Sequence, residues 1–406
     1  MPAPFIVLVD APPCAADGTP REPGAIAELL TRQVEVANRV WFEVFGHGDF
    51  AEFPHKTLAT LQFQKYRRRR VVVALDREVR GLGTAPEGLP LVLPDTDLGA
   101  ARVLGSSQVS HEFENNPRLV DEVEIVVAGQ ERRRGIGSAI QAAIETVARA
   151  WGATTVSGFS SHVGPPSQDL LMPAEGPFGV GRDDVATRFA LAHGYHLAQG
   201  ERHSMQTLPE DPARLGQPDV ADGYELVCWG GVIDPTLAQD MAELVTAFEA
   251  TVPMGELEYN PQVITAERVL DSSRESHRHN DSLTVAVRHR ESGHLAGFTQ
   301  LFTAHELPEP VWQGITVVLP EHRGHRLGMA IKVAAVHEAR RRWPGAKRVH
   351  TWNAGENAHM WAINEPLGYV TAGVAGAWQK KLVQRRRGPS GGEHGSAAAH
   401  ADAEHE

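Results

Sequence analysis

The sequence is poor in cysteine and has no long apolar run. Its 406 residues include two cysteines, Cys14 and Cys228, which lie far apart and have no Cys-x-x-Cys partner. This pattern excludes a disulfide framework and thiol redox chemistry, and it predicts a cytoplasmic location. No stretch approaches the roughly 18 consecutive apolar residues of a membrane-spanning helix, so we expect no membrane partner. The apolar start of the chain predicts a strand at 5–9 rather than a signal peptide.

Positive charge is also scarce, because the formal net charge is −12. Such a balance opposes general nucleic-acid binding, which requires a basic face. The run at 65–70 (KYRRRR) is an exception, and we interpret it as a solvated edge leading into a strand at 71–75, with a polyanion site as the alternative. The chain has 20 histidines but no His-Glu-x-x-His and no paired Cys/His spacing, so we expect no metal site.

The length predicts two or three domains. Residues 209–223 (PEDPARLGQPDVADG) are rich in turn formers and indicate a linker, and the low-complexity end of the chain indicates a disordered tail. We therefore expect an N-terminal domain at 1–210, a linker at 211–222, a C-terminal domain at 223–384 and a tail at 385–406.

Two segments of the chain repeat each other at an offset of 191 residues. In the first, a β-branched strand at 123–127 precedes Arg132-Arg133-Arg134-Gly135-Ile136-Gly137; in the second, a strand at 315–318 precedes Arg323-Gly324-His325-Arg326-Leu327-Gly328. Each turn leads into a helix with apolar residues at three- and four-residue spacing, a further strand, and a short helix ending in Gly-Tyr. The first copy is longer by 17 residues, which coincide with a Gly/Pro-rich stretch at 164–182 that we interpret as a surface loop.

The turn between strand and helix is where a phosphate group could bind. Glycine lets a ligand approach the backbone closely, and the unpaired N–H groups of a helix start suit a pyrophosphate, to which flanking arginines add charge-assisted contacts. The spacing does not fit the dinucleotide fingerprint Gly-x-Gly-x-x-Gly, and the Lys-Ser/Thr of an NTPase phosphate loop is absent. The pattern therefore disfavours both of these nucleotide sites.

Both repeats resemble the acyl-CoA-binding segment of the GNAT superfamily of N-acyltransferases. The marks are a strand, the motif [Q/R]-x-x-G-x-[G/A], a helix, a second strand and a final helix ending in Gly-aromatic. The first copy matches the motif fully, whereas the second has Arg326 in place of the first glycine but carries Asn353, Asn357 and Asn364 in its later segment. The resemblance covers about 25–384 as two tandem domains and implies an α/β (α+β) fold, in which each domain has a mixed, mostly antiparallel sheet flanked by helices.

The resemblance implies where acetyl-CoA, or another acyl-CoA, would bind. The strand before each turn separates from its neighbour and pairs with the pantetheine arm, and the turn and helix start hold the pyrophosphate. The residues implied in the first domain are Ile125, Val126, Val127, Arg132, Arg133, Arg134, Gly135, Ile136, Gly137 and Ser138. Those implied in the second are Thr316, Val317, Val318, Arg323, Gly324, His325, Arg326, Leu327, Gly328, Asn353 and Asn357.

Catalysis would require a base that deprotonates the acceptor amine. Glu124, on the first strand, is one candidate, and Glu258 and Tyr259 in the second domain are others, while the equivalent of Glu124 there is Ile315. The tyrosine that many members use to protonate the thiolate is replaced by Ala190 and Asn364; Asn364 could donate a hydrogen bond but cannot transfer a proton. Because three asparagines converge in the second domain, our hypothesis favours that domain for catalysis and leaves cofactor binding or stabilisation to the first.

Three functional hypotheses remain from the sequence. The leading one is an N-acyltransferase that moves an acetyl or acyl group from acyl-CoA to the amine of a small molecule by direct attack in a ternary complex, in specialised metabolism. The second keeps the fold but takes the acyl group from an acyl carrier protein or an aminoacyl-tRNA. The third is a catalytically degenerate CoA-binding module.

Overall fold

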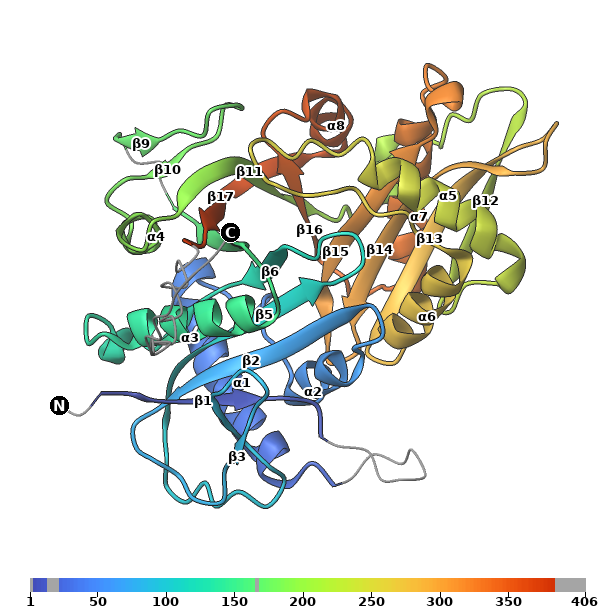
Figure 1. Cartoon of the computed structure of the whole chain (residues 1–406). Coiled ribbons are helices and arrows are strands. Elements are labelled where there is room, and N and C mark those ends of the chain that lie inside the picture. Colours follow the sequence, from blue (N-terminus) through green and yellow to red (C-terminus); the bar gives the residue numbers. More distant parts are fainter. Residues whose placement is uncertain (1–2, 13–21, 165–167, 384–406) are drawn as a thin grey trace, which may run out of the picture.

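The structure, a computed structural model, describes residues 3–12, 22–164 and 168–383. Within them, a single 15-stranded sheet runs through both halves of the chain and helices cover its faces (Figure 1). Most neighbouring strands are antiparallel, which confirms the expected sheet type. The predicted tail and Cys14 lie outside the described residues. No helix in the described ranges is both long and apolar enough to cross a bilayer.

The first half supplies the strands β1 (Phe5–Val9), β2 (Arg67–Leu75), β3 (Gly83–Thr84), β4 (Pro90–Leu91), β5 (Val103–Glu112), β6 (Leu119–Val123), β7 (Val126–Val127), β8 (Thr155–His162) and β11 (His196–Thr207). Its helices are α1 (Gly24–Phe45), α2 (Pro54–Gln62), α3 (Ile136–Ala150) and α4 (Val185–Ala192). The second half supplies β12 (Tyr224–Gly230), β13 (Asn280–His289), β14 (Leu295–Ala304), β15 (Leu307–Val318), β16 (Arg348–Ala354) and β17 (Tyr369–Lys381). Its helices are α5 (Ala238–Glu249), α6 (Ala266–His277), α7 (Leu327–Arg342) and α8 (Ala358–Asn364). The strands predicted at 5–9 and 71–75 and the helix expected after the first turn are therefore confirmed.

The two halves exchange their last strands. The sheet order is β12-β13-β14-β15-β16-β11-β17-β8-β6-β5-β2-β1-β4-β3, with β7 beside β5. β11 of the first half therefore lies next to β16 of the second, and β17 of the second lies next to β8 of the first. The division at 210 and 223 remains a prediction about the chain, but the sheet shows that each half is completed by a strand of the other.

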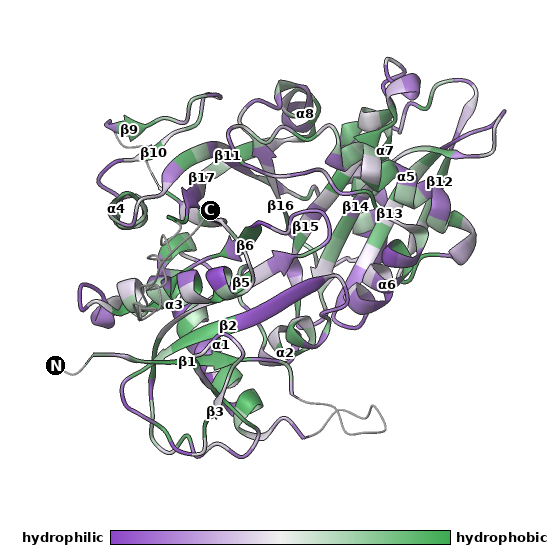
Figure 2. Cartoon of the chain, viewed as in Figure 1, coloured by the Kyte–Doolittle hydropathy of each residue, from purple (hydrophilic) through white to green (hydrophobic). Residues whose placement is uncertain are grey.

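Helices cover both faces of the sheet, and alternate side chains of a strand pack against the helices on opposite faces. On β2, Val72 and Ala74 join the cluster that contains Ile144 of α3, whereas Val71 and Val73 join the cluster that contains α1. Residues two apart on a strand point to the same face, so one strand anchors both helices. Figure 2 shows that β2 changes from hydrophilic to hydrophobic along its length. Its first part is the end of the basic run at 65–70, in which Lys65, Arg67 and Arg70 form ion pairs with acidic residues. Arg67 and Arg70 are largely buried in a strand that pairs with β5, so this part of the run is not the solvated edge that we expected.

A buried ion pair joins the α1–α2 loop to the second half. Asp49 accepts two hydrogen bonds of 2.6 Å from Arg348 and one of 3.0 Å from Nε2 of His350, both on β16. Nδ1 of His350 lies 3.1 Å from Nε2 of His203 on β11. Burial alone would raise the pKa of Asp49, but the hydrogen bonds from His350 and Arg348 hold it well below its usual range. The two halves are thus held together by charge as well as by the shared sheet.

The two cores differ at one equivalent position. In the first half, the hydroxyl of Tyr195 donates to Oε1 of Gln141 on α3 at 3.1 Å. In the second half, the equivalent residues are Tyr369 and Lys332. Nζ of Lys332 is buried 5.0 Å from the ring centroid of Tyr369 and has no hydrogen-bond partner among the described residues. Burial lowers the pKa of Lys332 to about 7.

The Gly/Pro-rich insertion at 164–182 forms a small two-stranded sheet within its described part. β9 (Leu170–Leu171) pairs with β10 (Val180–Gly181), and the ring of Phe178 lies 5.2 Å from that of Trp361 on α8. The insertion expected as a surface loop therefore packs against the second half.

Candidate functional site

In the first half, two neighbouring strands separate and form a wedge. β6 and β8 run parallel and pair from Leu119 and Thr155 to Val123 and Gly158, with a register shift between Val120 and Val123. Past that point the chain bends at β7, which pairs only with β5 among the described residues. Ile125, Val126 and Val127 therefore lie on one wall of this first wedge, and the edge of β7 that faces away from β5 has no strand partner.

The second half contains an equivalent wedge. The parallel pairing of β15 and β16 covers only Pro310–Trp312 and Arg348–His350, although β15 continues alongside β14 to Val318. Thr316, Val317 and Val318 lie beyond the last paired residue. The strand separation expected from the resemblance is thus present in both halves.

The two turns that follow these strands have the same shape. Nε of Arg132 donates to the carbonyl of Val127 at 3.0 Å, and Nε of Arg323 donates to that of Val318 at 3.3 Å. Two residues of each turn have positive φ: Arg133 (63°) and Gly135 (78°) in the first, Gly324 (87°) and Arg326 (56°) in the second. Glycine and arginine have exchanged positions between the copies, so Arg326 departs from the motif without changing the backbone.

The turns face open space, whereas the next residues anchor the helices. A Cβ atom built on Gly135 would meet no atom within 4 Å, and Ile136 directly after it is buried. A Cβ on Gly137 would come within 2.9 Å of Phe189 on α4. The second turn repeats this arrangement with Gly324, Leu327 and Gly328, the last beside Ile363. Gly135 thus leaves room for a ligand. Gly137 and Gly328 are explained by close packing between the helix that contains each of them and a second helix.

The exposed N–H groups and charges of the turns are available for an anion. The first N–H groups of an α-helix have no intrahelical acceptor, and α3 and α7 both begin at the turn. Arg132 is paired with Glu43 at 2.7 Å and Arg134 with Glu131, whereas Arg133 is exposed without a partner in the described part. Ser138 contacts Nε2 of His193 at 3.0 Å. In the second turn Arg323, His325 and Arg326 are exposed.

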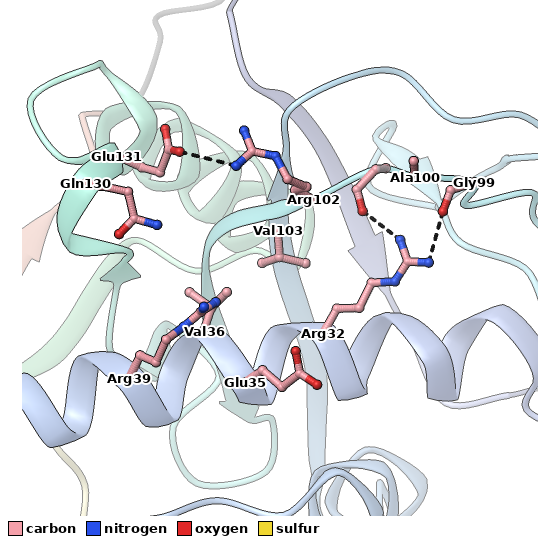
Figure 3. Close-up of a pocket in the computed structure, with 11 residues that line it drawn as sticks. Arg32, Glu35, Val36, Arg39, Gly99, Ala100, Arg102, Val103, Gln130 and Glu131 are labelled. Atoms are coloured by element: carbon pink, nitrogen blue, oxygen red, sulfur yellow. Dashed lines mark hydrogen bonds and ion pairs between the residues drawn. The ribbon is translucent and has the colours of Figure 1, made fainter.

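A cavity of about 370 Å³ lies beside the first turn (Figure 3). Arg32, Glu35 and Arg39 of α1 and Arg102 before β5 line it, together with Gln130 and Glu131 of the turn itself. Arg32 is held by the carbonyls of Gly99 and Ala101 and Arg102 by Glu131, whereas Arg39 has no partner among the described residues.

Two carboxyl groups meet on the α1 side of the first wedge. Glu124 follows the last paired residue of β6, and the side chain of Glu52 in the α1–α2 loop is close enough to interact with it electrostatically. Oε1 of Glu52 accepts from Nε1 of Trp41 at 2.9 Å, while Oε2 is buried and has no hydrogen-bond partner within the described ranges. Asn38 fixes the loop by bonding the backbone N–H and carbonyl of Glu52 at 2.7 and 3.0 Å.

These surroundings make Glu124 a basic carboxylate. It has no hydrogen-bond or ion-pair partner within the described ranges, and burial, aided by the charge of Glu52, raises its pKa to about 8. Burial also raises the pKa of Glu52, although the bond from Trp41 opposes this. Sequence reasoning missed Glu52 because it belongs to no motif and only the fold of the α1–α2 loop brings it to the wedge.

The second wedge is apolar at the corresponding place. Ile315, the equivalent of Glu124, packs with Val245 and Phe248 of α5 in a cluster that contains Phe298 and Val317.

Glu258 and Tyr259 instead lie on the α5–α6 loop, which crosses to strands of the other half of the sheet. Glu258 is exposed and paired with Lys381, and it accepts from Oγ1 of Thr155 at 3.2 Å. The hydrogen bond from Lys381 lowers the pKa of Glu258. The hydroxyl of Tyr259 donates to Glu249 at 2.8 Å, and burial raises its pKa. The structure does not bring this pair of candidate bases to the second wedge.

The structure brings together two of the three asparagines. Nδ2 of Asn364 donates to Oδ1 of Asn353 at 3.0 Å, and Oδ1 of Asn364 is buried with no partner in the part of the chain that the structure describes. Asn357 caps α8 by accepting from the N–H of Met360 at 3.2 Å. A helix cap therefore explains Asn357, while Asn353 and Asn364 form a polar contact between β16 and α8.

No group of three or more His, Cys, Asp or Glu side chains in the described part of the chain is arranged to hold a metal ion.

Comparisons with known proteins agree with this geometry. The sequence matches no protein-family model and no curated protein. Among solved structures, the chain is similar to a tandem GNAT protein from the clavulanic acid biosynthesis pathway, with a TM-score of 0.67, 23% identity, and coverage of 94% of this chain and 99% of that one. The chain has a tandem GNAT fold. A GCN5-related N-acetyltransferase from Sphaerobacter thermophilus is similar over 93% of this chain and 95% of its own, with a TM-score of 0.54 and 16% identity.

This result confirms, at the level of fold, the resemblance suggested by the two turns. It also accounts for the repeat, since each copy of the strand–turn–helix unit forms one wedge of the tandem arrangement.

Proposed function

We propose that the chain is an N-acyltransferase that moves an acyl group from acetyl-CoA, or another acyl-CoA, to the amine of a small molecule by direct attack in a ternary complex. The observation that carries the proposal is the pair of carboxyl groups of Glu52 and Glu124 beside the first wedge. Glu124 has no cationic partner among the described residues. A site of this kind favours a cationic amine.

The first wedge and turn fit an acyl-CoA. The unpaired edge of β7, at Ile125–Val127, would bond the pantetheine arm, and the open space at Gly135 would let a pyrophosphate approach the N–H groups at the start of α3. Arg133 and Arg39, which have no partner among the described residues, add positive charge on the turn and beside it. When bound, the acyl-CoA supplies a thioester carbonyl that is activated toward an amine.

Glu124 would act as the base. An amine arrives as an ammonium ion, and its positive charge beside Glu52 and Glu124 favours the ionised form of both carboxyl groups. A base is most effective when its pKa lies near the working pH, and the pKa of about 8 for Glu124 meets this condition. Once Glu124 has taken the proton, the amine can attack the carbonyl, while unpaired N–H groups of the wedge stabilise the developing oxyanion.

This assignment places the chemistry in the first half and departs from our hypothesis based on the asparagines. The second wedge has the turn and the strand separation, but Ile315 occupies the position of the base. We assign the second half to cofactor binding or to stabilisation of the pair.

Acyl transfer from acetyl-CoA to a panel of small amines tests the proposal. Glu124→Gln keeps the shape of the side chain but removes the base, and we expect it to lower kcat/KM by about 10²–10⁴-fold. Glu201→Gln is the matched control, because Glu201 on β11 is a partly buried carboxyl whose pKa burial raises to about 7. Equal activity of the Glu124 variant and the wild type would overturn the role of Glu124.

A further inference from the structure

Four side chains in the first half form a continuous hydrogen-bond chain that the acyl transfer described above does not use. Nε1 of Trp378 on β17 lies 2.7 Å from Oγ of Ser160 on β8, and that oxygen lies 2.7 Å from Nε2 of His162. Nδ1 of His162 lies 2.7 Å from Oδ2 of Asp184, directly before α4. Ser160 and His162 are two apart on one strand, so they share a face of the sheet.

The direction of every proton in this chain is fixed. An indole N–H can only donate, so Ser160 accepts from Trp378, and a carboxylate can only accept, so Nδ1 of His162 donates to Asp184. In the neutral ring Nε2 is then unprotonated, and Ser160 donates its own proton to it. This is the tautomer in which a histidine removes a proton from a serine and a carboxylate holds the ring in place.

His162 is suited to accept a proton rather than to supply one. Burial lowers its pKa below the ordinary value, although the bond and charge of Asp184 partly offset this. At neutral pH the ring is thus uncharged, and the lone pair of Nε2 faces the hydroxyl of Ser160. The neutral ring has no proton to give at Nε2 until it has taken one, so its first role is to activate a nucleophile.

Ser160 also lies where a bound thioester would be. Gly158 is the last residue of β8 in register with β6, and Ser160 follows two residues later on the wall of the first wedge opposite β7. It shares a face with Val156, which belongs to the cluster of α3, whereas Glu124 interacts with the α1–α2 loop. Nucleophile and amine base thus approach the wedge from opposite faces of the sheet.

We propose that Ser160 is a nucleophile that takes the acyl group from a thioester in the first wedge, giving the chain an acyl-thioester hydrolase activity when no amine is bound. This inference rests on the proposed function, because it requires the thioester to lie in that wedge. His162 takes the proton of Ser160 as Oγ bonds to the carbonyl carbon; the carbon–sulfur bond breaks, and His162 returns the proton to the thiolate. Water then attacks the acyl-serine with His162 as base, which releases the carboxylic acid and the free serine.

The test measures thiol release from acetyl-CoA without an amine, together with the mass of the acid-quenched protein. We expect wild-type protein to release CoA steadily and to carry one acetyl group on the peptide that contains Ser160. Ser160→Ala should abolish the label and lower hydrolysis at least about a hundredfold. Ser161→Ala is the matched control, since Ser161 is the next residue, is partly exposed and has no hydrogen-bond partner among the described residues.

Two further measurements keep the outcome decisive. Asp184→Asn alters a half-exposed residue outside the core, so the protein should fold, and it should slow hydrolysis by disfavouring the required tautomer. p-Nitrophenyl acetate labels an activated serine without any CoA site, which separates failure of the nucleophile from failure of acyl-CoA binding. Equal hydrolysis by the wild type and Ser160→Ala, or no label from either donor, would overturn the proposal, while retained amine acylation in Ser160→Ala would leave the proposed function intact.

Discussion

Replacing Glu124 with glutamine should change stability in a way that depends on pH. The pKa of Glu124 is about 8 in the folded chain, against an ordinary value of 4.5. Between these values the folded protein holds a proton that the unfolded chain releases, so the contribution of Glu124 is fully present below pH 4.5 and is lost as pH rises toward 8. A shift of this size corresponds to roughly 5 kcal/mol at about 1.4 kcal/mol per unit. Because Glu124 keeps some exposed surface, solvent relieves part of this cost, and we expect about 2–4 kcal/mol.

Glu124→Gln is uncharged at every pH and escapes this loss. Urea unfolding should therefore give nearly equal free energies for variant and wild type at pH 5, and a variant that is more stable by about 2–4 kcal/mol at pH 9. Glu201→Gln should behave in the same way, but its change should be complete near pH 7. Glu52→Gln should move the transition of Glu124 to lower pH, because it removes a neighbouring negative charge. A difference between Glu124→Gln and wild type that does not vary with pH would refute the reasoning.

Three further changes have definite expected effects. Lys332→Gln should raise the free energy of unfolding by about 1–3 kcal/mol at pH 6, because at that pH the wild type must bury a charged ammonium group. At pH 11 the amine is uncharged in both the folded and the unfolded state, so an effect that persisted unchanged there would contradict this account. Gly137→Ala should lower the melting temperature by crowding Phe189, at a cost of about 1–3 kcal/mol, and the smaller partner in Phe189→Leu should restore it. Asp49→Asn should lower the free energy of unfolding by about 3–5 kcal/mol at pH 7, because it leaves Arg348 without its carboxylate. In urea unfolding this difference should shrink below about pH 4, because the unfolded wild type then binds a proton at Asp49 that the folded protein does not, which destabilises the wild type.

The sequence predicted the local units well because they depend on short-range patterns. The apolar spacing after Gly135 identified α3, and the β-branched runs at 5–9 and 71–75 identified β1 and the end of β2. The offset between the two turns revealed the repeat, and the resemblance of both copies to GNAT domains implied the tandem fold. Positive φ at both Gly135 and Arg326 shows that even the copy with the weaker motif keeps the same turn.

Features that depend on distant parts of the chain could not be predicted in this way. The strand exchange pairs β11 with β16 and β17 with β8, and no local pattern in either strand specifies that partner. The proximity of Glu52 to Glu124 depends on the fold of the α1–α2 loop. The hydrogen bond between His162 and Asp184 spans 22 residues across the insertion. For the same reason Glu258, placed by sequence order near the second wedge, lies instead against Thr155 and Lys381.

The central claim is that the first wedge and its turn bind the acyl donor used in catalysis. Calorimetric titration of acetyl-CoA, paired with an amine-acylation assay, tests it in two matched variants. Gly135→Glu brings a negative charge to the turn. Gly135→Arg imposes the same backbone strain with the opposite charge, and Arg326 shows that an arginine adopts a positive φ at the equivalent position of the second turn.

The account predicts that Gly135→Glu loses both binding at the first turn and amine acylation, while Gly135→Arg keeps both. Arg326→Glu should affect binding only at the second turn and leave acylation in place. Full activity in Gly135→Glu, or activity lost only in Arg326→Glu, would contradict the assignment of catalysis to the first half. Absence of any acetyl-CoA binding by the wild type would contradict the acyl-CoA donor itself and favour a donor bound to a carrier protein or tRNA.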